Sequence, residues 1–202
     1  MRTSLVAAAV LFLTLPVLGQ GGGVTMGGWE ARLDSARGDV NDLSFRAMGE
    51  GFHVTTGPAA IFWNPSNTGS GSYTVSATFT QTKASSHLNS FGLFFGGQDL
   101  AGDGQRYTYF LIREDGQFLI KKRMGGNTEN LTSGWAAHSA VNKLDERMTN
   151  SISVEVGAST VRFLSNGTEV ASLPKAGLDV DGVAGVRFSH QLDVHVGDFT
   201  VG

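Results

Sequence analysis

The chain contains no cysteine among its 202 residues. This absence excludes disulfide bonds, thiol catalysis, thiolate zinc sites and lipid attachment at a cysteine. Proline is scarce, with 4 residues, and no apolar run reaches the roughly 20 residues that a transmembrane helix needs. A domain built from this chain must therefore be stabilised by packing and hydrogen bonds alone.

An excess of basic charge is also missing, since the formal net charge is −3 at pH 7. The one basic run is Lys121-Lys122-Arg123, and successive residues of a strand point to opposite faces. A broad basic surface is what binding to nucleic acid requires. We therefore expect no nucleic-acid partner.

The N-terminus has the pattern of a secretory signal peptide. Arg2 forms a short basic region, an apolar run extends over 5–18, and the small residue Gly19 follows. We predict a signal peptide over 1–19, a secreted or periplasmic protein, and no membrane insertion after cleavage. Residues 20–28 read as a flexible Gly-rich leader and 29–202 as one domain.

Short runs of β-branched and aromatic residues, separated by Gly, Asn, Asp and Ser, fill the rest of the chain. This pattern predicts an all-β, two-sheet antiparallel sandwich. Only 41–46 and 135–144 have any helical character, and both are short. The predicted strands are 29–33, 43–47, 51–55, 59–63, 73–82, 91–96, 107–113, 117–123, 151–156, 160–165, 168–173, 183–189 and 193–201.

Two dipeptides, Asp115-Gly116 and Asn166-Gly167, are typical of two-residue hairpin turns. For the first hairpin such a turn pairs Arg113 with Phe118 and Tyr109 with Lys122. Both faces of this hairpin carry apolar residues near the turn. We expect one face to enter the core and the other to be open to a ligand.

Five segments together resemble a known superfamily: AAIFWNPSNTGSGSYTVSATFTQTK, SFGLFFGGQDL, YTYFLIREDGQFLIKKR, NGTEVASL and VAGVRFSHQLDVHVGDFTV. Their order is similar to that in secreted concanavalin A-like lectin/glucanase domains, near the laminin-G-like and 3-keto-disaccharide hydrolase (DUF1080) types. The resemblance implies a jelly-roll sandwich whose concave sheet and rim loops often carry sugar sites. A shared fold does not by itself carry a shared activity.

The glucanases of this superfamily carry an E-x-D-x-x-E strand, and this chain has no such motif. The polar segment SHQLDVHVGD instead makes Asp193 and His195 the catalytic candidates if the protein is an enzyme. Their spacing along one strand does not match a catalytic triad with Ser189. A structural polar pair between Asp193 and His195 is the favoured interpretation.

The loop GGQDLAGDGQ makes Asp99 and Asp103 candidates for Ca²⁺ ligands. Two carboxylates are few for the 6 to 8 oxygens that Ca²⁺ usually takes, so a plain loop is favoured. Sugars stack on exposed aromatic rings, although Trp and Tyr often pack in a core instead. The candidate ligand-binding residues are Trp63, Tyr107, Tyr109, Lys121, Arg123 and Trp135.

These observations favour a secreted, non-catalytic β-sandwich that binds carbohydrate or another extracellular polymer. Two alternatives stay open. One is a sugar-processing hydrolase similar to the 3-keto-disaccharide hydrolases. The other is an envelope or matrix protein-interaction module.

Overall fold

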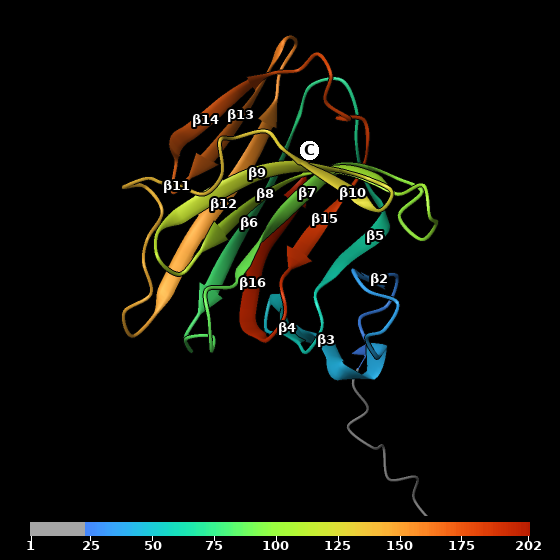
Figure 1. The fold of residues 1–202 in the computed structure, drawn as a ribbon, viewed down its shortest axis with the longest axis vertical. Helices are drawn as coiled ribbons and strands as arrows, with labels where there is room; N and C mark the ends of the chain where they lie inside the picture. Colours follow the sequence, from blue (N-terminus) through green and yellow to red (C-terminus); the bar gives the residue numbers. More distant parts are fainter. Residues whose placement is uncertain (1–22) are drawn as a thin grey trace, which may run out of the picture.

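The computed structural model describes residues 23–202 as two curled β-sheets packed face to face (Figure 1). The predicted signal peptide lies outside the described residues. Every strand pair is antiparallel except one parallel pair near the N-terminus. The predicted all-β, two-sheet sandwich is thus confirmed.

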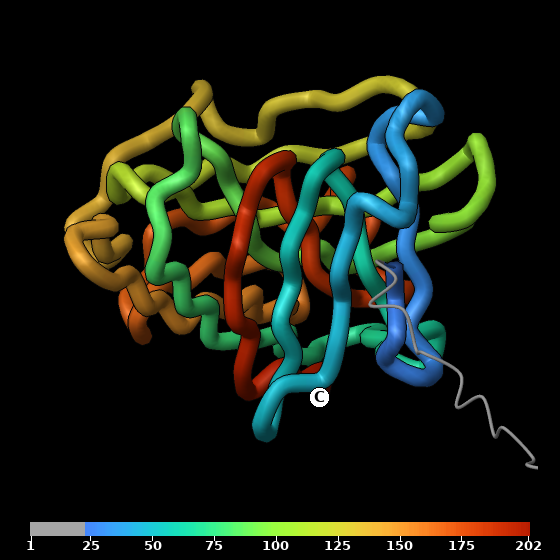
Figure 2. Tube along the Cα trace, turned by 90° about the horizontal axis from the view of Figure 1, so that it is seen from below, coloured from blue at the N-terminus to red at the C-terminus, as the bar shows by residue number. Residues whose placement is uncertain are grey.

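The first sheet has eight strands in the spatial order β1-β3-β4-β16-β6-β12-β13-β14. Figure 2 shows the C-terminal strand β16 beside β4, which lies far earlier in the chain. Their bounds are β1 Gly23–Val24, β3 Leu43–Met48, β4 Gly51–Thr56, β16 Leu192–Val201, β6 Tyr73–Gln81, β12 Met148–Val156, β13 Thr160–Ser165 and β14 Thr168–Pro174.

The second sheet follows the order β10-β9-β8-β7-β15-β5-β2, and a short strand β11 also pairs with β9. A single turn of 3₁₀ helix, η1 at Val40–Asp42, precedes β3. The strand bounds are β10 Asn127–Asn130, β9 Gln117–Met124, β8 Arg106–Arg113, β7 Ser90–Gln98, β15 Gly182–Phe188, β5 Ala60–Gly69, β2 Glu30–Leu33 and β11 Ala136–Ala137.

All the predicted strand segments form strands, whereas neither helical candidate forms an α-helix. Residues 41–46 belong to the end of η1 and to β3, and 135–144 is mostly irregular with the short β11. The sequence did not indicate β1, which pairs Gly23 with Ser44. The first sheet therefore begins inside the stretch that the sequence pattern assigned to a leader. In residues 23–202, no helix has the length and apolarity needed to cross a membrane.

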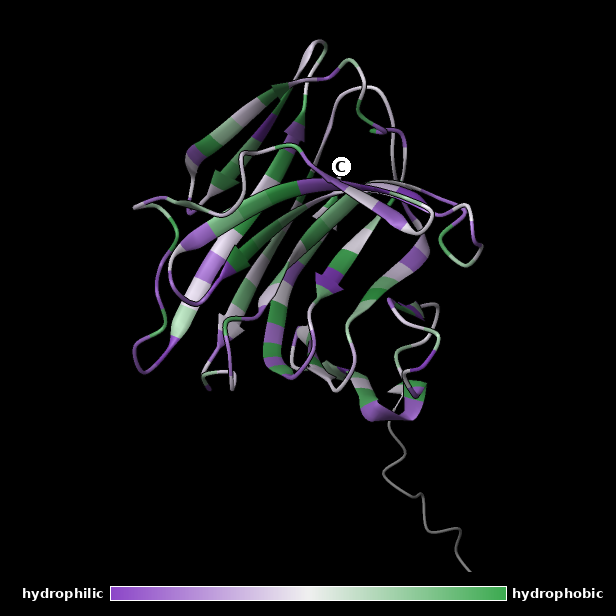
Figure 3. Ribbon diagram, in the orientation of Figure 1, coloured by the Kyte–Doolittle hydropathy of each residue, from purple (hydrophilic) through white to green (hydrophobic). Residues whose placement is uncertain are grey.

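The main core lies between the sheets and consists of alternate residues of both. Strand β6 shows the pattern that its sequence predicts, with Tyr73, Val75, Ala77 and Phe79 buried and the intervening residues partly exposed. The bands of alternating hydropathy along the strands are visible in Figure 3. A strand that faces a core on one side needs this alternation.

The hairpin between β8 and β9 differs from its predicted register by one residue. The observed pairs are Arg113 with Gln117 and Tyr109 with Lys121. The cause is a three-residue turn, because Gly116 has φ 81° and its N–H donates to the carbonyl of Arg113 at 3.0 Å. A type I turn followed by a left-handed Gly is the usual three-residue hairpin loop. Since side chains alternate, the shift exchanges the faces of the whole second strand relative to the first.

Candidate functional site

A second cluster of buried side chains covers the face of the second sheet that points away from the main core. Its apolar members come from β5, β7, β8 and the loop after β7. Trp135 and Val183 pack against its edge. The buried members are Ile61, Trp63, Phe94, Leu100, Tyr107, Tyr109 and Leu111.

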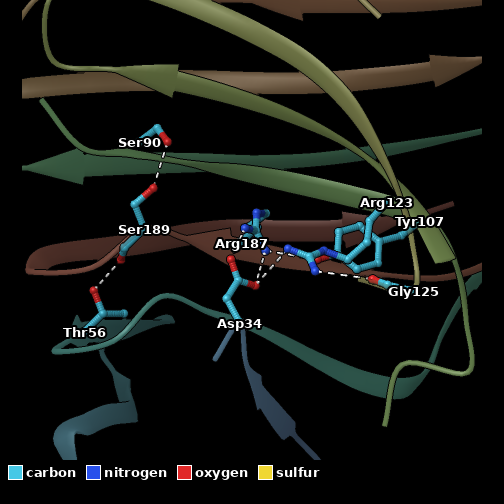
Figure 4. Close-up of polar contacts among 8 residues, drawn as sticks. All are labelled: Asp34, Thr56, Ser90, Tyr107, Arg123, Gly125, Arg187 and Ser189. Carbon is cyan, nitrogen blue, oxygen red and sulfur yellow. Dashed lines mark hydrogen bonds and ion pairs between the residues drawn. The ribbon is translucent and has the colours of Figure 1, made fainter. Parts of the chain in front are cut away.

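Four polar side chains interact beside this aromatic cluster, and one of them, Tyr107, is also a member of it (Figure 4). Both terminal nitrogens of Arg187 bond to the carboxylate of Asp34, with 2.9 Å between Nη1 and Oδ1. The same Nη1 donates to the hydroxyl of Tyr107 at 3.0 Å. Arg123 approaches Asp34 from the other side, with 3.5 Å from Nη2 to Oδ1. We call Asp34, Tyr107, Arg123 and Arg187 the concave-face network.

The network shows how strongly the second sheet curls. Asp34 directly follows β2, whereas Arg123 lies in β9, five strand steps away in the sheet order. In a flat sheet five steps span about 24 Å at about 4.8 Å per step. The 3.5 Å contact between the two side chains therefore requires the sheet to fold around the aromatic cluster. This face is the concave one.

Burial and charge fix the ionisation of the network. Burial opposes the charge on Arg187, but Tyr107 and Asp34 hold the pKa of its guanidinium above the ordinary value. Burial also opposes ionisation of Asp34, and Arg187 outweighs it, so the pKa of this carboxyl is lowered. Burial raises the pKa of the Tyr107 hydroxyl. The network therefore holds the charged pair of Asp34 and Arg187, together with Arg123, beside the neutral hydroxyl of Tyr107.

A groove of about 1070 Å³ lies against this network. One wall is the end of β2 with the 34–40 segment, and the other is the turn between β9 and β10. Arg123 is only 9% exposed and Gln105 only 6%, so both side chains are packed against protein and present a small surface to the groove. The polar and turn residues at the groove include Arg32, Asp34, Asp103, Gln105, Arg123 and Gly126.

The predicted ligand-binding residues lie on one face, but not as exposed rings. Trp63, Tyr107 and Tyr109 are 4%, 0% and 2% exposed. The guanidinium of Arg187 covers the ring of Tyr109 at 4.9 Å. These three rings therefore present almost no surface on which a sugar could stack.

The remaining three predicted ligand residues have different surroundings. Trp135 is partly buried, and the guanidinium of Arg113 lies 4.4 Å from its ring centre. Arg123 belongs to the concave-face network. Lys121 lies opposite Tyr109 on the same face, where burial and the charges of Arg187 and Arg123 lower its pKa.

Asp34, Gln105 and Arg187 were not predicted. Arg187 alone carried a usable signal, since it is the one charged residue in the strand GVAGVRF. A charge inside such a strand is rarely buried without a partner. Asp34 had no signal, because its partners lie 89 and 153 residues later in the chain.

The candidate Ca²⁺ residues lie in the loop between β7 and β8. Asp99 adopts φ 50° and accepts a hydrogen bond from the amide of Gly104 at 3.0 Å. The exposed carboxylate of Asp103 points toward Arg32, with 3.7 Å from Nη2 to Oδ1. Nowhere in 23–202 do three or more His, Asp or Glu side chains gather around one point.

The proposed polar pair of Asp193 and His195 does not form. Asp193 bonds instead to His53 of β4, with 2.8 Å from Oδ1 to Nε2. His195 lies directly opposite His53, and the two rings are 6.4 Å apart between centres. Asp193 and His53 lie on the neighbouring strands β16 and β4, so the sequence of one strand could not show that they are partners. Asp193 lines a hollow of about 440 Å³, and His195 is not among the residues of that hollow.

The structure resembles several solved structures of one fold type. A carbohydrate-binding module, CBM66 from Bacillus subtilis, superimposes with a TM-score of 0.65 at 11% identity, covering 89% of this chain and 98% of the module. A glycoside hydrolase family 16 endo-glucanase from Bacteroides ovatus gives 0.60 at 10% identity, covering 86% and 93%. A protein of unknown function with a galectin-like fold from Bacillus subtilis gives 0.58 at 13% identity, covering 86% and 88%.

The chain has the concanavalin A-like jelly-roll fold. The resemblance of the sequence to this superfamily is thus confirmed at the level of fold. No family model and no curated protein matches the chain. At identities of 10–13%, these similarities show a shared fold and do not show a shared activity.

Proposed function

We propose that this protein is a secreted or periplasmic, non-catalytic module that binds carbohydrate in the groove of its concave sheet. The observation that carries the proposal is the groove itself, which is lined by Asp34 and Arg123 of the concave-face network beside the buried aromatic cluster. The fold supports this reading, because two of the proteins with this fold are named as a carbohydrate-binding module and a glucanase.

Sugar hydroxyls need donors and acceptors held close together. Arg123 offers only donors, Asp34 only acceptors, and Gln105 both. The network holds Asp34 and Arg123 in place, so little side-chain entropy is lost at these two residues on binding. The groove volume of about 1070 Å³ lies just above the range of about 300 to 1,000 Å³ that small-ligand sites occupy.

The charges at the groove favour a neutral glycan. The two basic side chains, Arg32 and Arg123, are outnumbered by the three acidic ones, Asp34, Asp39 and Asp103. A groove selective for an acidic polymer would carry an excess of basic groups. We therefore expect binding to neutral polysaccharides or oligosaccharides, with little dependence on salt concentration.

The chemistry of Asp34 supports a non-catalytic role. Both of its oxygens bond to Arg187, which holds its pKa low and leaves it unsuited to act as a general acid. The alternative hydrolase needs titratable groups that converge on one point. Asp193 and His195 do not meet this condition, because Asp193 pairs with His53 and His195 does not line the hollow beside Asp193.

The experiment is a glycan array with the mature protein, followed by calorimetry on the best ligand. Gly126→Trp should block the groove, since a side chain at Gly126 meets nothing within 4 Å and no positive φ opposes it. Gly197→Trp is the matched control, because Gly197 also has open space but lies in β16 of the other sheet.

We expect the affinity to fall at least about tenfold in Gly126→Trp, which is about 1.4 kcal/mol, and to stay unchanged in Gly197→Trp. Absence of binding across plant, fungal and bacterial glycans would overturn the proposal. Equal affinity in the two variants would show that the sugar binds outside the groove. Specific capture of a secreted protein, without any glycan binding, would support the alternative of an interaction module.

A further inference from the structure

Two histidines from different loops meet at one end of the sandwich, away from the concave groove. His87 lies in the 82–89 connection between β6 and β7, and His190 in the 189–191 turn between β15 and β16. Their Nε2 atoms contact each other, and the ring centres are 4.6 Å apart. The chain has 5 histidines, and this contact includes two of them.

The hydrogen bonds around His87 determine which of its ring nitrogens carries the proton. Ser86 Oγ donates its single hydrogen to Oε1 of Gln191 at 2.7 Å. The 2.9 Å contact between Ser86 Oγ and Nδ1 of His87 must therefore have Nδ1–H as the donor. In the neutral ring, Nε2 is then left with a free lone pair, and this atom faces His190.

This arrangement is the one that a metal-ligating histidine has. Such a histidine donates its other ring N–H to an oxygen, which fixes the tautomer and the orientation of the ring. Ser86 provides that oxygen for His87, and Gln191 in turn holds Ser86. The same hydrogen bonds tie the two loops to each other.

Both loops are anchored to the sandwich on either side of the histidines. Ser189 N donates to Ser90 O at 2.8 Å, and the hydroxyls of Ser90 and Ser189 are 2.9 Å apart. Thr56 Oγ1 donates to Ser189 O at 2.7 Å (Figure 4). On the other loop, Ser85 Oγ donates to the carbonyl of His87 at 2.8 Å. The two imidazoles are thus presented by backbone that is held in place.

We propose that His87 and His190 form a two-histidine site for a divalent transition metal such as Zn²⁺. Imidazole nitrogen is a preferred ligand for Zn²⁺ and Cu²⁺. The contact between the two Nε2 atoms places both imidazoles where one metal ion can reach them. His190 binds the metal through Nε2 in its Nδ1–H tautomer, and water can accept this N–H because His190 is exposed.

The geometric change on binding is small. Two nitrogens at about 2.05 Å from a tetrahedral metal are about 3.3 Å apart, so the rings need only to move apart slightly. Both rings are exposed and can rotate to do so. Two coordination positions then remain open to water, beside the hollow that Ser86, Gln191 and Asp193 line.

The test is a titration of the mature protein with Zn²⁺ alone, followed by calorimetry. We expect one Zn²⁺ per chain and an affinity at least about tenfold weaker in His87→Ala and in His190→Ala. Ser86→Ala should weaken binding less, through the lost orientation of His87. In NMR spectra recorded during the titration, the ring signals of His87 and His190 should shift at lower Zn²⁺ concentrations than those of the other histidines.

Two controls make the result specific. His138→Ala removes an unrelated histidine whose Nδ1 accepts from the amide of Ala140 at 3.1 Å. His195→Ala removes one member of the pair formed with His53. Neither should change the Zn²⁺ affinity. Absence of binding at millimolar Zn²⁺, or binding that is lost in His195→Ala and kept in His87→Ala, would overturn the proposal.

Discussion

The two faces of the second sheet are packed by different kinds of interaction. Its inner face contributes apolar residues such as Phe110 and Phe188 to the core between the sheets. Its concave face carries aromatic residues closed by the ion pair of Asp34 and Arg187. The inner face gains stability from area and shape alone, whereas the concave face depends on the geometry of a few polar atoms.

This difference separates folding from binding. An apolar core tolerates changes of sequence as long as volume is kept. A buried charge does not tolerate loss of its partner, because it is left desolvated and unpaired. On the concave face, each buried charged residue therefore needs its particular partner, whereas the inner face needs only apolar side chains of suitable volume.

The largest effect is expected from a cavity in the main core. Phe79→Ala removes a fully buried ring that stacks on Phe91 at 5.4 Å between centres. We expect the free energy of unfolding to fall by about 3–5 kcal/mol. Urea denaturation measures it. At temperatures where the variant is folded, binding in the groove should be unchanged, because Phe79 belongs to the first sheet and packs in the core between the sheets. A parallel loss of affinity would contradict the separation of the main core from the concave face.

The next effect comes from breaking the network. Asp34→Ala leaves Arg187 buried without its carboxylate, and we expect a loss of about 3 kcal/mol in the free energy of unfolding. Unlike Phe79→Ala, this change should also weaken glycan binding. Asp34→Asn is the control, since its amide oxygen still accepts one hydrogen bond and should retain part of the stability. A loss within the range of an exposed ion pair, below about 1 kcal/mol, would show that the network is not structural.

Acid should act on the concave face through the same carboxylate. The pKa of Asp34 is lowered in the folded protein, so its ionised form stabilises the fold above the ordinary Asp value of about 3.9. That contribution is lost as the pH falls through the lowered pKa. The stability difference between the wild type and Asp34→Asn should therefore shrink below about pH 3.9, and urea midpoints at several pH values measure it. A difference independent of pH would contradict this account.

The smallest effect is expected at Lys121. Burial and the charges of Arg187 and Arg123 lower its pKa, so its protonated form is unfavourable in the folded protein. Lys121→Met should raise the free energy of unfolding slightly, by at most about 0.5 kcal/mol. Lys122→Met is a matched control on the neighbouring residue, which pairs with Glu129 at 3.1 Å and should lose stability when changed. Thermal denaturation of both variants compares them, and a loss in Lys121→Met equal to that in Lys122→Met would contradict the sign.

Hairpin turns show why some of the fold could be predicted and some could not. Asn166-Gly167 forms the predicted two-residue turn, with φ 51° and 77° and Ser165 paired with Thr168. Asp115-Gly116 contains an equally suitable dipeptide but belongs to a three-residue loop that includes Glu114. Local residue preference allowed both turns, and only the packing of both strands in the sheet selected the register.

The residues of the candidate site could likewise be predicted only in part. The sequence placed Tyr107, Tyr109, Lys121 and Arg123 on one hairpin, but its predicted register put the two tyrosines and the two basic residues on opposite faces. The one-residue shift of the observed register brings all four to the concave face. It could not show that the rings would be covered by protein atoms. The covering group, Arg187, comes from β15, which is two strands away from β8 in the sheet.

The sequence by itself determined the all-β class, most of the strand segments and the sandwich, because alternation and turn chemistry are local properties. Tertiary structure alone decided the partners: Asp34 with Arg187, Asp193 with His53, and His87 with His190. Each of these pairs joins residues from different strands or loops. Their contact depends on strand order and on the curl of a sheet, which no local pattern encodes.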